Sequence, residues 1–299
     1  LAQFGVNATF VTAIPDNDIG QACINYIRQF GVDTSKILRQ GTRLGTYYLE
    51  SGASMRASKV VYDRAASSIA EIKPGDIDWE AVFAGQDWFH FTGITPAISK
   101  SAALVCEEAA VAAKQLGLTV SADMNYRKNL WTAEEAQATM IPMMKHVDIS
   151  IGNEEDAEKC LGVAAEGVDV TAGELNPDAY RPVVQELVDR FDFKKVGITL
   201  RESQSADDND WSAIYYDGEE ILIGKKYPVR IVDRVGGGDS FCAAMIYGQN
   251  RDDWNSRQVL DFAVAASAMS HTFHGDFNLV SVKEVMAVAG GDTSGRVQR

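Results

Sequence analysis

The residues most suited to chemistry are three consecutive glycines that end on an aspartate, Gly236-Gly237-Gly238-Asp239. Residues 227–232 before them are rich in Val and Ile, and an apolar stretch with alanines at helical spacing follows. The pattern therefore predicts that the glycines lie where a strand gives way to a helix. Backbone N–H groups at a helix N-terminus lack intrahelical partners and meet the positive end of the dipole, so these glycines could cradle a phosphate.

The aspartate needs a different role, because its negative charge would repel an anion in that cradle. Asp239 fits better as a general base that takes a proton from an attacking hydroxyl, and this pairing favours phosphoryl transfer. The structural alternative is a glycine-rich turn with an acidic cap, since Gly and Asp are both common at helix starts. From these residues alone the two interpretations carry similar weight, because short glycine motifs also occur by chance.

Composition limits the class of protein. The chain has 299 residues, of which 46% are hydrophobic and 23% charged, so we expect one or two globular domains. A net charge of −14 argues against binding to nucleic acids or anionic membranes. No apolar run approaches the roughly 18 residues that span a bilayer. The cysteines are scattered without a C-x-x-C pair and predict reduced thiols in a cytoplasmic protein: Cys23, Cys106, Cys160 and Cys242.

Residues 79–248 alternate short apolar strands with amphipathic helices, which predicts an α/β fold with a parallel sheet flanked by helices. The expected strands cover 88–92, 119–123, 147–151 and 196–200, and the expected helices cover 99–116, 133–144, 154–161 and 177–191. Ligand crevices of such sheets lie beyond the carboxyl ends of the strands. Four polar residues fall at or just beyond those ends: Asp123, Asn153, Thr199 and Arg201.

The motif Asp-x-x-Gly-x-Gly-Asp-x-Phe, which runs from Asp233 to Phe241, resembles the C-terminal signature of the ribokinase-like (PfkB) carbohydrate kinases. Arg234 and Val235 stand where many members have Thr-Thr or Thr-Val, and Gly237 replaces a common Ala; neither change removes a backbone donor. The likeness extends along nearly the whole chain. Within the family, the chain most resembles the 2-keto-3-deoxygluconate kinases. The segments that carry this narrower match are 61–65, 91–96, 123–127 with 130–131, and 199–203.

The resemblance implies a ribokinase-like core made of residues 1–37 and 73–299, and a small β-lid made of residues 38–72. Residues 45–50 and 59–62 look like the lid strands. In the family the lid covers the sugar, excludes water and often joins subunits, so we expect a homo-oligomer formed through it. The first five residues resemble the end of a helix that follows the family's first strand and Gly-Gly turn, and we expect that beginning to be missing here.

The resemblance assigns the catalytic base to Asp239 and the phosphate donors to the backbone of Gly236, Gly237 and Gly238. It places Tyr47, Tyr62, Arg64 and Arg127 around the sugar. Arginine suits a sugar acid because its planar fork binds a carboxylate with two hydrogen bonds. Without the family, a lone loop arginine is more often part of a surface ion pair, and Tyr47 has an equal claim to be an ordinary strand residue.

The resemblance also assigns nucleotide and metal contacts. Thr199 and Arg201 would contact the nucleotide phosphates from a loop after their strand, together with Gly236 and Gly238, while Ala265 and Ala268 would shape the adenine pocket. Asn153 and Asp156 would position Mg²⁺ and its waters. Close helix packing explains the alanines equally well, and an acidic residue at a helix start has a structural reason of its own. His271, His274 and Asp276 could suggest a metal site. The two histidines have no firm third ligand, however, so we predict no transition metal there.

The resulting hypothesis is an enzyme that uses ATP and Mg²⁺ to phosphorylate the terminal hydroxyl of 2-keto-3-deoxy-D-gluconate to the 6-phosphate. One alternative is a kinase of a neutral sugar such as fructose or ribose, which would not need Arg64 and Arg127. Another is a ribokinase-like protein that binds a sugar without catalysis, and against it stands the intact Asp239. An NAD-dependent dehydrogenase would require a G-x-G-x-x-G after an early strand, and the sequence has none there.

Overall fold

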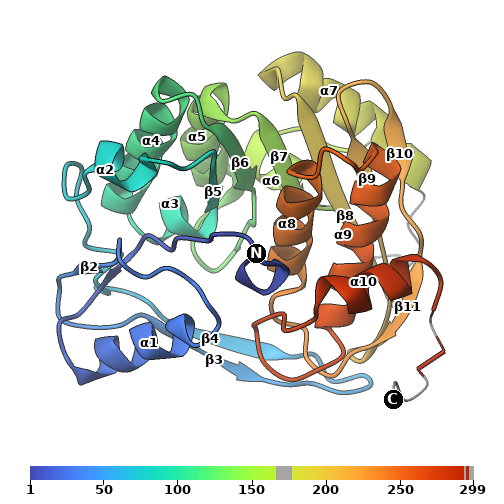
Figure 1. The fold of residues 1–299 in the computed structure, drawn as a ribbon, viewed down its shortest axis with the longest axis horizontal. Coiled ribbons are helices and arrows are strands. Elements are labelled where there is room, and N and C mark those ends of the chain that lie inside the picture. The colour runs from blue at the N-terminus through green and yellow to red at the C-terminus, as the bar shows by residue number, and fades with distance from the viewer. Residues whose placement is uncertain (166–176, 293, 296–299) are drawn as a thin grey trace.

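The computed structural model describes residues 1–165, 177–292 and 294–295, and Figure 1 shows its arrangement. Within that part of the chain the main sheet has seven strands in the order β10-β9-β8-β7-β6-β5, with β11 paired to β9. The strands are β5 (Trp88–Thr92), β6 (Thr119–Asp123), β7 (Ile149–Asn153), β8 (Lys195–Ser203), β9 (Asp208–Tyr216), β10 (Ile221–Ile223) and β11 (Tyr227–Arg230). β5 to β8 run parallel and the remaining pairs are antiparallel. The predicted α/β class is confirmed.

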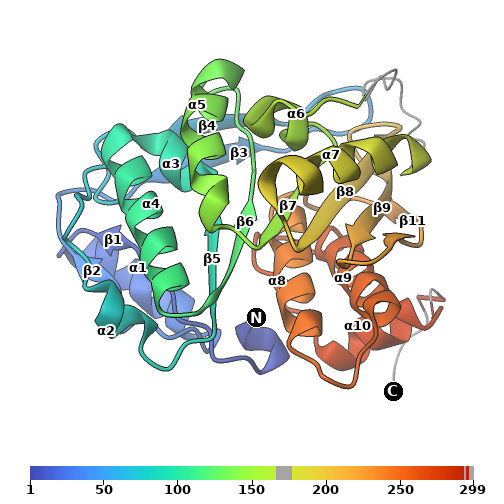
Figure 2. The same cartoon turned by 90° about the horizontal axis from the view of Figure 1, so that it is seen from above.

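Helices cover both faces of this sheet (Figures 1 and 2). They are η1 (Ala2–Phe4), α1 (Asp18–Arg28), α2 (Trp79–Phe83), α3 (Ile94–Ile98), α4 (Lys100–Gln115), α5 (Ala133–Met143), η2 (Met144–His146), α6 (Asp156–Leu161), η3 (Pro177–Tyr180), α7 (Arg181–Phe191), α8 (Gly237–Gln249), α9 (Ser256–Ser270) and α10 (Val282–Ala289). Side chains alternate along the strands, so Ile198 joins the core under α4, α5 and α7, while Ala213 and Tyr215 join the core under α8 and α9. The core therefore has three layers: the sheet in the middle and a layer of helices on each of its faces.

Two small sheets lie apart from these layers. β1 (Ala13–Ile14) pairs in parallel with β2 (Leu38–Arg39). β3 (Thr46–Glu50) and β4 (Lys59–Asp63) form an antiparallel ribbon, which confirms the expected pair of short strands. Tyr47 is directly opposite Tyr62 in this ribbon, so both side chains project from the same face. In Figure 1 the ribbon and α1 lie beneath the main sheet.

Some predicted boundaries differ from the structure. The strand expected at 147–151 lies two residues later, as β7, and the following helix begins at Asp156 instead of Glu154. The prediction that Thr199 and Arg201 lie in a loop after their strand is wrong, because β8 continues to Ser203. Its neighbour β9 pairs with it from Val196 to Ser203, so ladder hydrogen bonds keep the segment extended.

The first residues form a short 3₁₀ helix that ends at Gly5, whose φ of 81° is left-handed. Phe4 packs against Tyr247 and Phe262, with ring centroids 5.3 Å apart in each pair. The expected helix end therefore joins the core beneath α8 and α9. In the described ranges, no helix is both long and apolar enough to cross a membrane. The portions of the predicted core domain at 166–176, 293 and 296–299 lie outside the described residues.

Candidate active site

The glycines lie at the start of α8, as predicted. Gly236 has a left-handed φ of 81°, and Gly237 and Gly238 are the first helical residues, whose N–H groups have no acceptor within the helix. A Cβ on Gly237 would lie 2.5 Å from His271 Cε1, and one on Gly236 would lie 2.5 Å from the carbonyl oxygen of Asp276. A Cβ on Gly238 would meet nothing within 4 Å. The cradle is thus closed on one side by packing and open at Gly238.

Asp239 is the third residue of α8 and lines a cavity of about 870 Å³. Burial raises the pKa of this carboxyl group above its usual range; the positive charge of Arg127 opposes the shift and the negative charge of Asp276 adds to it. A carboxylate that is desolvated in this way holds a proton more readily than one in water. Asp239 is therefore suited to accept a proton beside the cradle.

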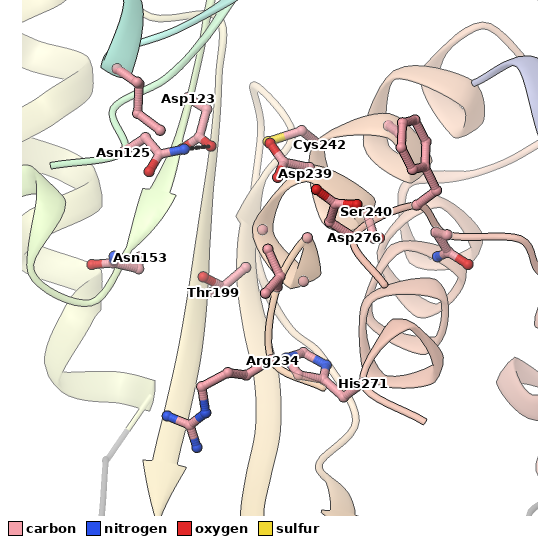
Figure 3. A pocket seen from close by; sticks show the side chains of 18 of the residues that line it. Asp123, Asn125, Asn153, Thr199, Arg234, Asp239, Ser240, Cys242, His271 and Asp276 are labelled. Atoms are coloured by element: carbon pink, nitrogen blue, oxygen red, sulfur yellow. Dashed lines mark hydrogen bonds between the residues drawn. The ribbon is translucent and has the colours of Figure 1, made fainter. Parts of the chain in front are cut away.

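Asp123 faces Asp239 from the other side of the crevice (Figure 3), and Asp156 lines the same cavity. Burial raises the pKa of Asp123, at the end of β6, well above its usual range, and the charges of Asp156 and Asp239 raise it further. Asn125 Nδ2 donates a 3.0 Å hydrogen bond to Asp123 Oδ2. Arg127 lowers the pKa of all three carboxylates, so its cation compensates a buried acidic cluster.

The β3–β4 ribbon adds a second arginine. The Arg64 guanidinium lies 4.6 Å from the ring centroid of Tyr62 and 5.8 Å from that of Tyr47. Burial lowers the pKa of Arg64, and the nearby charge of Arg127 lowers it too. Arg64 Nη1 is buried and has no hydrogen-bond partner within the described part of the chain. A buried donor without an acceptor is costly in a folded protein, so this one indicates a ligand.

Tyr47 also connects the ribbon to the opposite half of the molecule. Its hydroxyl donates a 2.9 Å hydrogen bond to Asp276 Oδ2, from the loop after α9. Burial raises the pKa of Tyr47, and the charge of Asp276 raises it further, so the phenol stays protonated as a donor. The structure thus brings all four predicted sugar residues, Tyr47, Tyr62, Arg64 and Arg127, to the lining of one cavity.

Thr199 and Arg201 line the same cavity from within β8. Thr199 is buried and its hydroxyl donates to the carbonyl of Gly152 at 3.4 Å. Arg201 lies 3.7 Å from Glu154, whose pKa burial raises to about 7. The predicted adenine contacts are placed differently: Ala265 and Ala268 are 0% and 5% exposed in the core and do not line the cavity. Helix packing accounts for both alanines, and their nucleotide role stays a prediction.

The residues predicted for Mg²⁺ are already engaged in local hydrogen bonds. Asp156 accepts from the N–H of Tyr126 at 2.9 Å and from that of Asn153 at 2.8 Å. The Asn153 side-chain oxygen accepts from the N–H groups of Glu155 and Asp156. In the described ranges, no three His, Cys, Asp or Glu side chains are grouped to hold a metal ion. The two side chains therefore shape the turn into α6 and fit an ion only through its waters.

Sequence reasoning gave no role to Asp123, although it noted its place at a strand end. The D-x-N-x-R spacing of residues 123–127 was the available signal, because it puts the acid, its amide partner and Arg127 in one loop. Asp276 was considered only as a metal ligand. Its bond to Tyr47 joins residues 229 positions apart, and no local pattern reports such a contact.

An N-terminal glycine cradle beside a desolvated carboxylate, with arginines across the crevice, defines a phosphotransferase site on an α/β sheet. Comparison with known families matches residues 1–281 to the family described as pfkB family carbohydrate kinase. The chain belongs to the pfkB family of carbohydrate kinases, and the predicted family is confirmed.

Solved structures agree with this assignment. The chain resembles the 2-dehydro-3-deoxygluconokinase of Thermotoga maritima at 48% identity, over 97% of this chain and 87% of that one, with a TM-score of 0.92. It resembles a PfkB family carbohydrate kinase of Listeria grayi at 31% identity, with the same coverage and a TM-score of 0.87. Among curated proteins, the 2-dehydro-3-deoxygalactonokinase of Haloferax volcanii is 27% identical over 98% of this chain and 85% of that one. The ribokinase-like fold is thereby confirmed.

Proposed function

We propose that this protein is a sugar-acid kinase that transfers the γ-phosphoryl group of ATP to the terminal hydroxyl of 2-keto-3-deoxy-D-gluconate and yields the 6-phosphate. The observation that carries the proposal is the buried Nη1 of Arg64, which has no hydrogen-bond partner among the described residues, in a side chain that lines the same cavity as Arg127 and Asp239. The 48% identity to a 2-dehydro-3-deoxygluconokinase supports the same substrate.

The two ends of the cavity divide the work. The carboxylate of the substrate binds Arg64 and Arg127. Its negative charge offsets the repulsion between the two arginines, and its oxygen accepts a hydrogen bond from Nη1 of Arg64. This places the terminal hydroxyl, at the opposite end of the sugar acid from its carboxylate, toward Asp239. Asp239 takes the hydroxyl proton as the oxygen attacks the γ-phosphorus, the bond to the β-phosphate oxygen breaks, and ADP leaves with that electron pair.

The backbone of Gly236, Gly237 and Gly238 would hold the transferring group. Free N–H groups at the start of α8 can donate to its equatorial oxygens, where charge concentrates during transfer. Mg²⁺ would arrive with the nucleotide as MgATP, since this ion keeps several waters and binds mainly through phosphates. Asn153 and Asp156 would meet it through those waters, and Thr199 and Arg201 would contact the remaining phosphates.

The β3–β4 ribbon would act as a lid over the sugar and as a subunit contact. Its outer face supports the second role, because Tyr48 is 62% exposed and Val61 is 52% exposed, and the two are paired across the ribbon. We therefore expect a homo-oligomer formed through residues 38–72, in line with the predicted lid. The predicted cytoplasmic location remains a proposal, supported by four free cysteines.

The test is an assay of ADP release with the purified protein, comparing 2-keto-3-deoxygluconate with its galacto epimer, fructose, ribose and a control without sugar. We expect turnover with the keto-deoxy acids and loss of it in Asp239→Asn. Turnover with fructose or ribose alone would instead identify a neutral-sugar kinase. Binding of sugar without turnover would identify a sensor.

A further inference from the structure

Arg234 is an unusual residue of the glycine motif, since it occupies a position where many family members have threonine. Its guanidinium lines the main cavity and is half-buried. Its Nη2 donates to the carbonyl of Ala206, in the turn between β8 and β9. Across the described ranges, no carboxylate lies within ion-pair distance of it, that is, within 4.0 Å. A half-buried cation that forms no ion pair in this part of the chain can accept an anionic ligand.

A second cation lies close to Arg234. Burial lowers the pKa of Arg234 and the positive charge of Arg201 lowers it further, while the negative charge of Asp207 opposes the shift. The partner of Arg201, Glu154, lies 3.7 Å away and is itself desolvated, so it neutralises this arginine only in part. Two arginines are therefore held near one another against their repulsion, and both line the cavity that contains the glycine cradle.

The position of Arg234 identifies which ligand it would meet. In Figure 3, Asp239 lies across the crevice from Asp123 and Asn125, and Arg234 and His271 lie together at the other end of the view. Arg234 lies two residues before Gly236 and lines the cavity beside Thr199 and Arg201, which would contact the nucleotide phosphates, so the phosphoryl donor is the anion that it would meet. The turn that holds Arg234 is itself fixed, because the Ala206 N–H donates to the Ser54 carbonyl at 2.8 Å.

We propose that Arg234, together with Arg201, binds the β-phosphate of the donor, and that Arg234 is a catalytic residue which stabilises the leaving diphosphate. This proposal rests on the kinase function proposed above. When the bond between the γ-phosphorus and the bridging oxygen breaks, its electron pair stays on the β-phosphate and adds negative charge there. A fixed guanidinium beside that oxygen stabilises the charge as it develops, with two donors in one plane. Threonine at this position would supply one neutral donor instead.

The first test is calorimetric binding of ADP and of inorganic tripolyphosphate to the full-length protein, without any acceptor sugar. We expect Arg234→Met to weaken both by about 10- to 100-fold, as for loss of a hydrogen-bonded charge, and to lower turnover by at least that factor. The KM for the sugar should not change. Arg230→Met is the matched control, because Arg230 is 75% exposed at the side chain, pairs with Asp207 and Asp208, and lies outside the cavity.

Unchanged ADP affinity in Arg234→Met would overturn the proposal, and so would a parallel weakening of ADP and sugar, which would indicate a structural role through the Ala206 turn. Wild-type protein that binds no ADP would overturn the kinase function itself. A second measurement avoids dependence on the variant's folding. In wild-type protein, ADP should protect Arg234 but not Arg230 from modification by phenylglyoxal, as mapped by mass spectrometry. Equal modification of Arg234 with and without ADP would contradict the proposal.

Discussion

The two ends of the cavity are built in different ways. The proposed phosphoryl end is made of backbone at the start of α8 and is packed into the core. Gly237 lies against His271, which is buried and packs on Trp211 at 4.7 Å between ring centroids. The proposed sugar end is made of side chains, from the two-stranded ribbon and from the loop after β6 that holds Arg127. The outer face of that ribbon, at Tyr48 and Val61, is exposed.

This difference separates what each end can change. At Gly236 and Gly237 a single added methyl group would meet packed atoms, so function and stability are coupled at these two positions. At the sugar end, side chains of the ribbon can be exchanged without moving the three layers, so substrate choice can change while the fold stays the same. Variants at the two ends should therefore fail in different ways, and the predictions below exploit this.

The largest effect is expected for Asp239→Asn, at the junction of the two ends. Loss of the base should lower turnover by about 10²- to 10⁴-fold with ATP as donor. The amide also removes a buried charge. Because the pKa of Asp239 is raised in the folded state, its stabilising contribution is present at low pH and lost as pH rises through that pKa. The melting temperature of the variant at pH 8 should therefore match or exceed that of wild type, and a large drop would argue for a structural role.

Paired substitutions at the glycines test the claim that the phosphoryl end is coupled to the core. Gly237→Ala should lose about 1–3 kcal/mol of unfolding free energy, because its Cβ would meet the buried His271 ring. Gly238→Ala should keep its stability, because its Cβ meets nothing. Turnover should fall in both, since the methyl group of the second lies on the open side of the cradle. Denaturant titration and steady-state rates check this, and equal stability of the two variants would break the comparison.

At the sugar end, Arg64→Met should raise the KM for a keto-deoxy sugar acid by about 10- to 100-fold through loss of a charge-assisted pair. ADP affinity and the melting temperature should stay close to wild type. Arg56→Met is the matched control, because Arg56 lies in the loop that joins the two ribbon strands, and its side chain is 69% exposed and paired with Glu50. A KM shift of similar size in both variants would show that the lid responds to any lost charge.

The last effect concerns the pH dependence of stability and leaves turnover aside. Burial raises the pKa of Glu154 from 4.5 to about 7, so the stability that its neutral form provides is complete below pH 4.5 and is lost as pH rises through 7. The Glu154→Gln side chain is neutral at every pH. The unfolding free energy of this variant should exceed that of wild type by up to about 3 kcal/mol at pH 8 and should equal it at pH 4. Exposed Glu155→Gln serves as the control. Melting curves across this range check the sign, and a less stable Glu154→Gln at pH 8 would refute it.

Local patterns in the sequence predicted correctly that the glycines and Asp239 lie at the start of a helix. Residues 233–241 contain the turn, the helix start and the carboxylate in one contiguous stretch, so their arrangement follows from backbone geometry alone. The alternation of strands and helices likewise predicted the order of β5 to β8. Boundaries were less accurate where pairing with a neighbour decides them: β8 extends to Ser203 because β9 runs beside it, and nothing within residues 199–203 signals that partner.

The sugar end depended on the resemblance to a family, because its members come from separate parts of the chain. Arg127 follows β6 while Arg64 follows β4, and the two residues come close together only in the tertiary structure. The acid cluster was also missed, since Asp123 and Asp156 gain their unusual environment only when two strand ends meet. The alanines of α9 show the opposite case, in which small residues at helical spacing belong to the core.

The most direct test of the central claim compares kcat/KM for 2-keto-3-deoxygluconate with that for its neutral C1 carboxamide, in wild-type protein and in Arg64→Met. If Arg64 recognises the carboxylate, wild type should favour the acid by about 10- to 100-fold, and the variant should lose most of that preference. Rates with the carboxamide should be nearly equal in the two proteins. A preference for the acid that survives in Arg64→Met, or that is absent in wild type, would contradict this account of the sugar end.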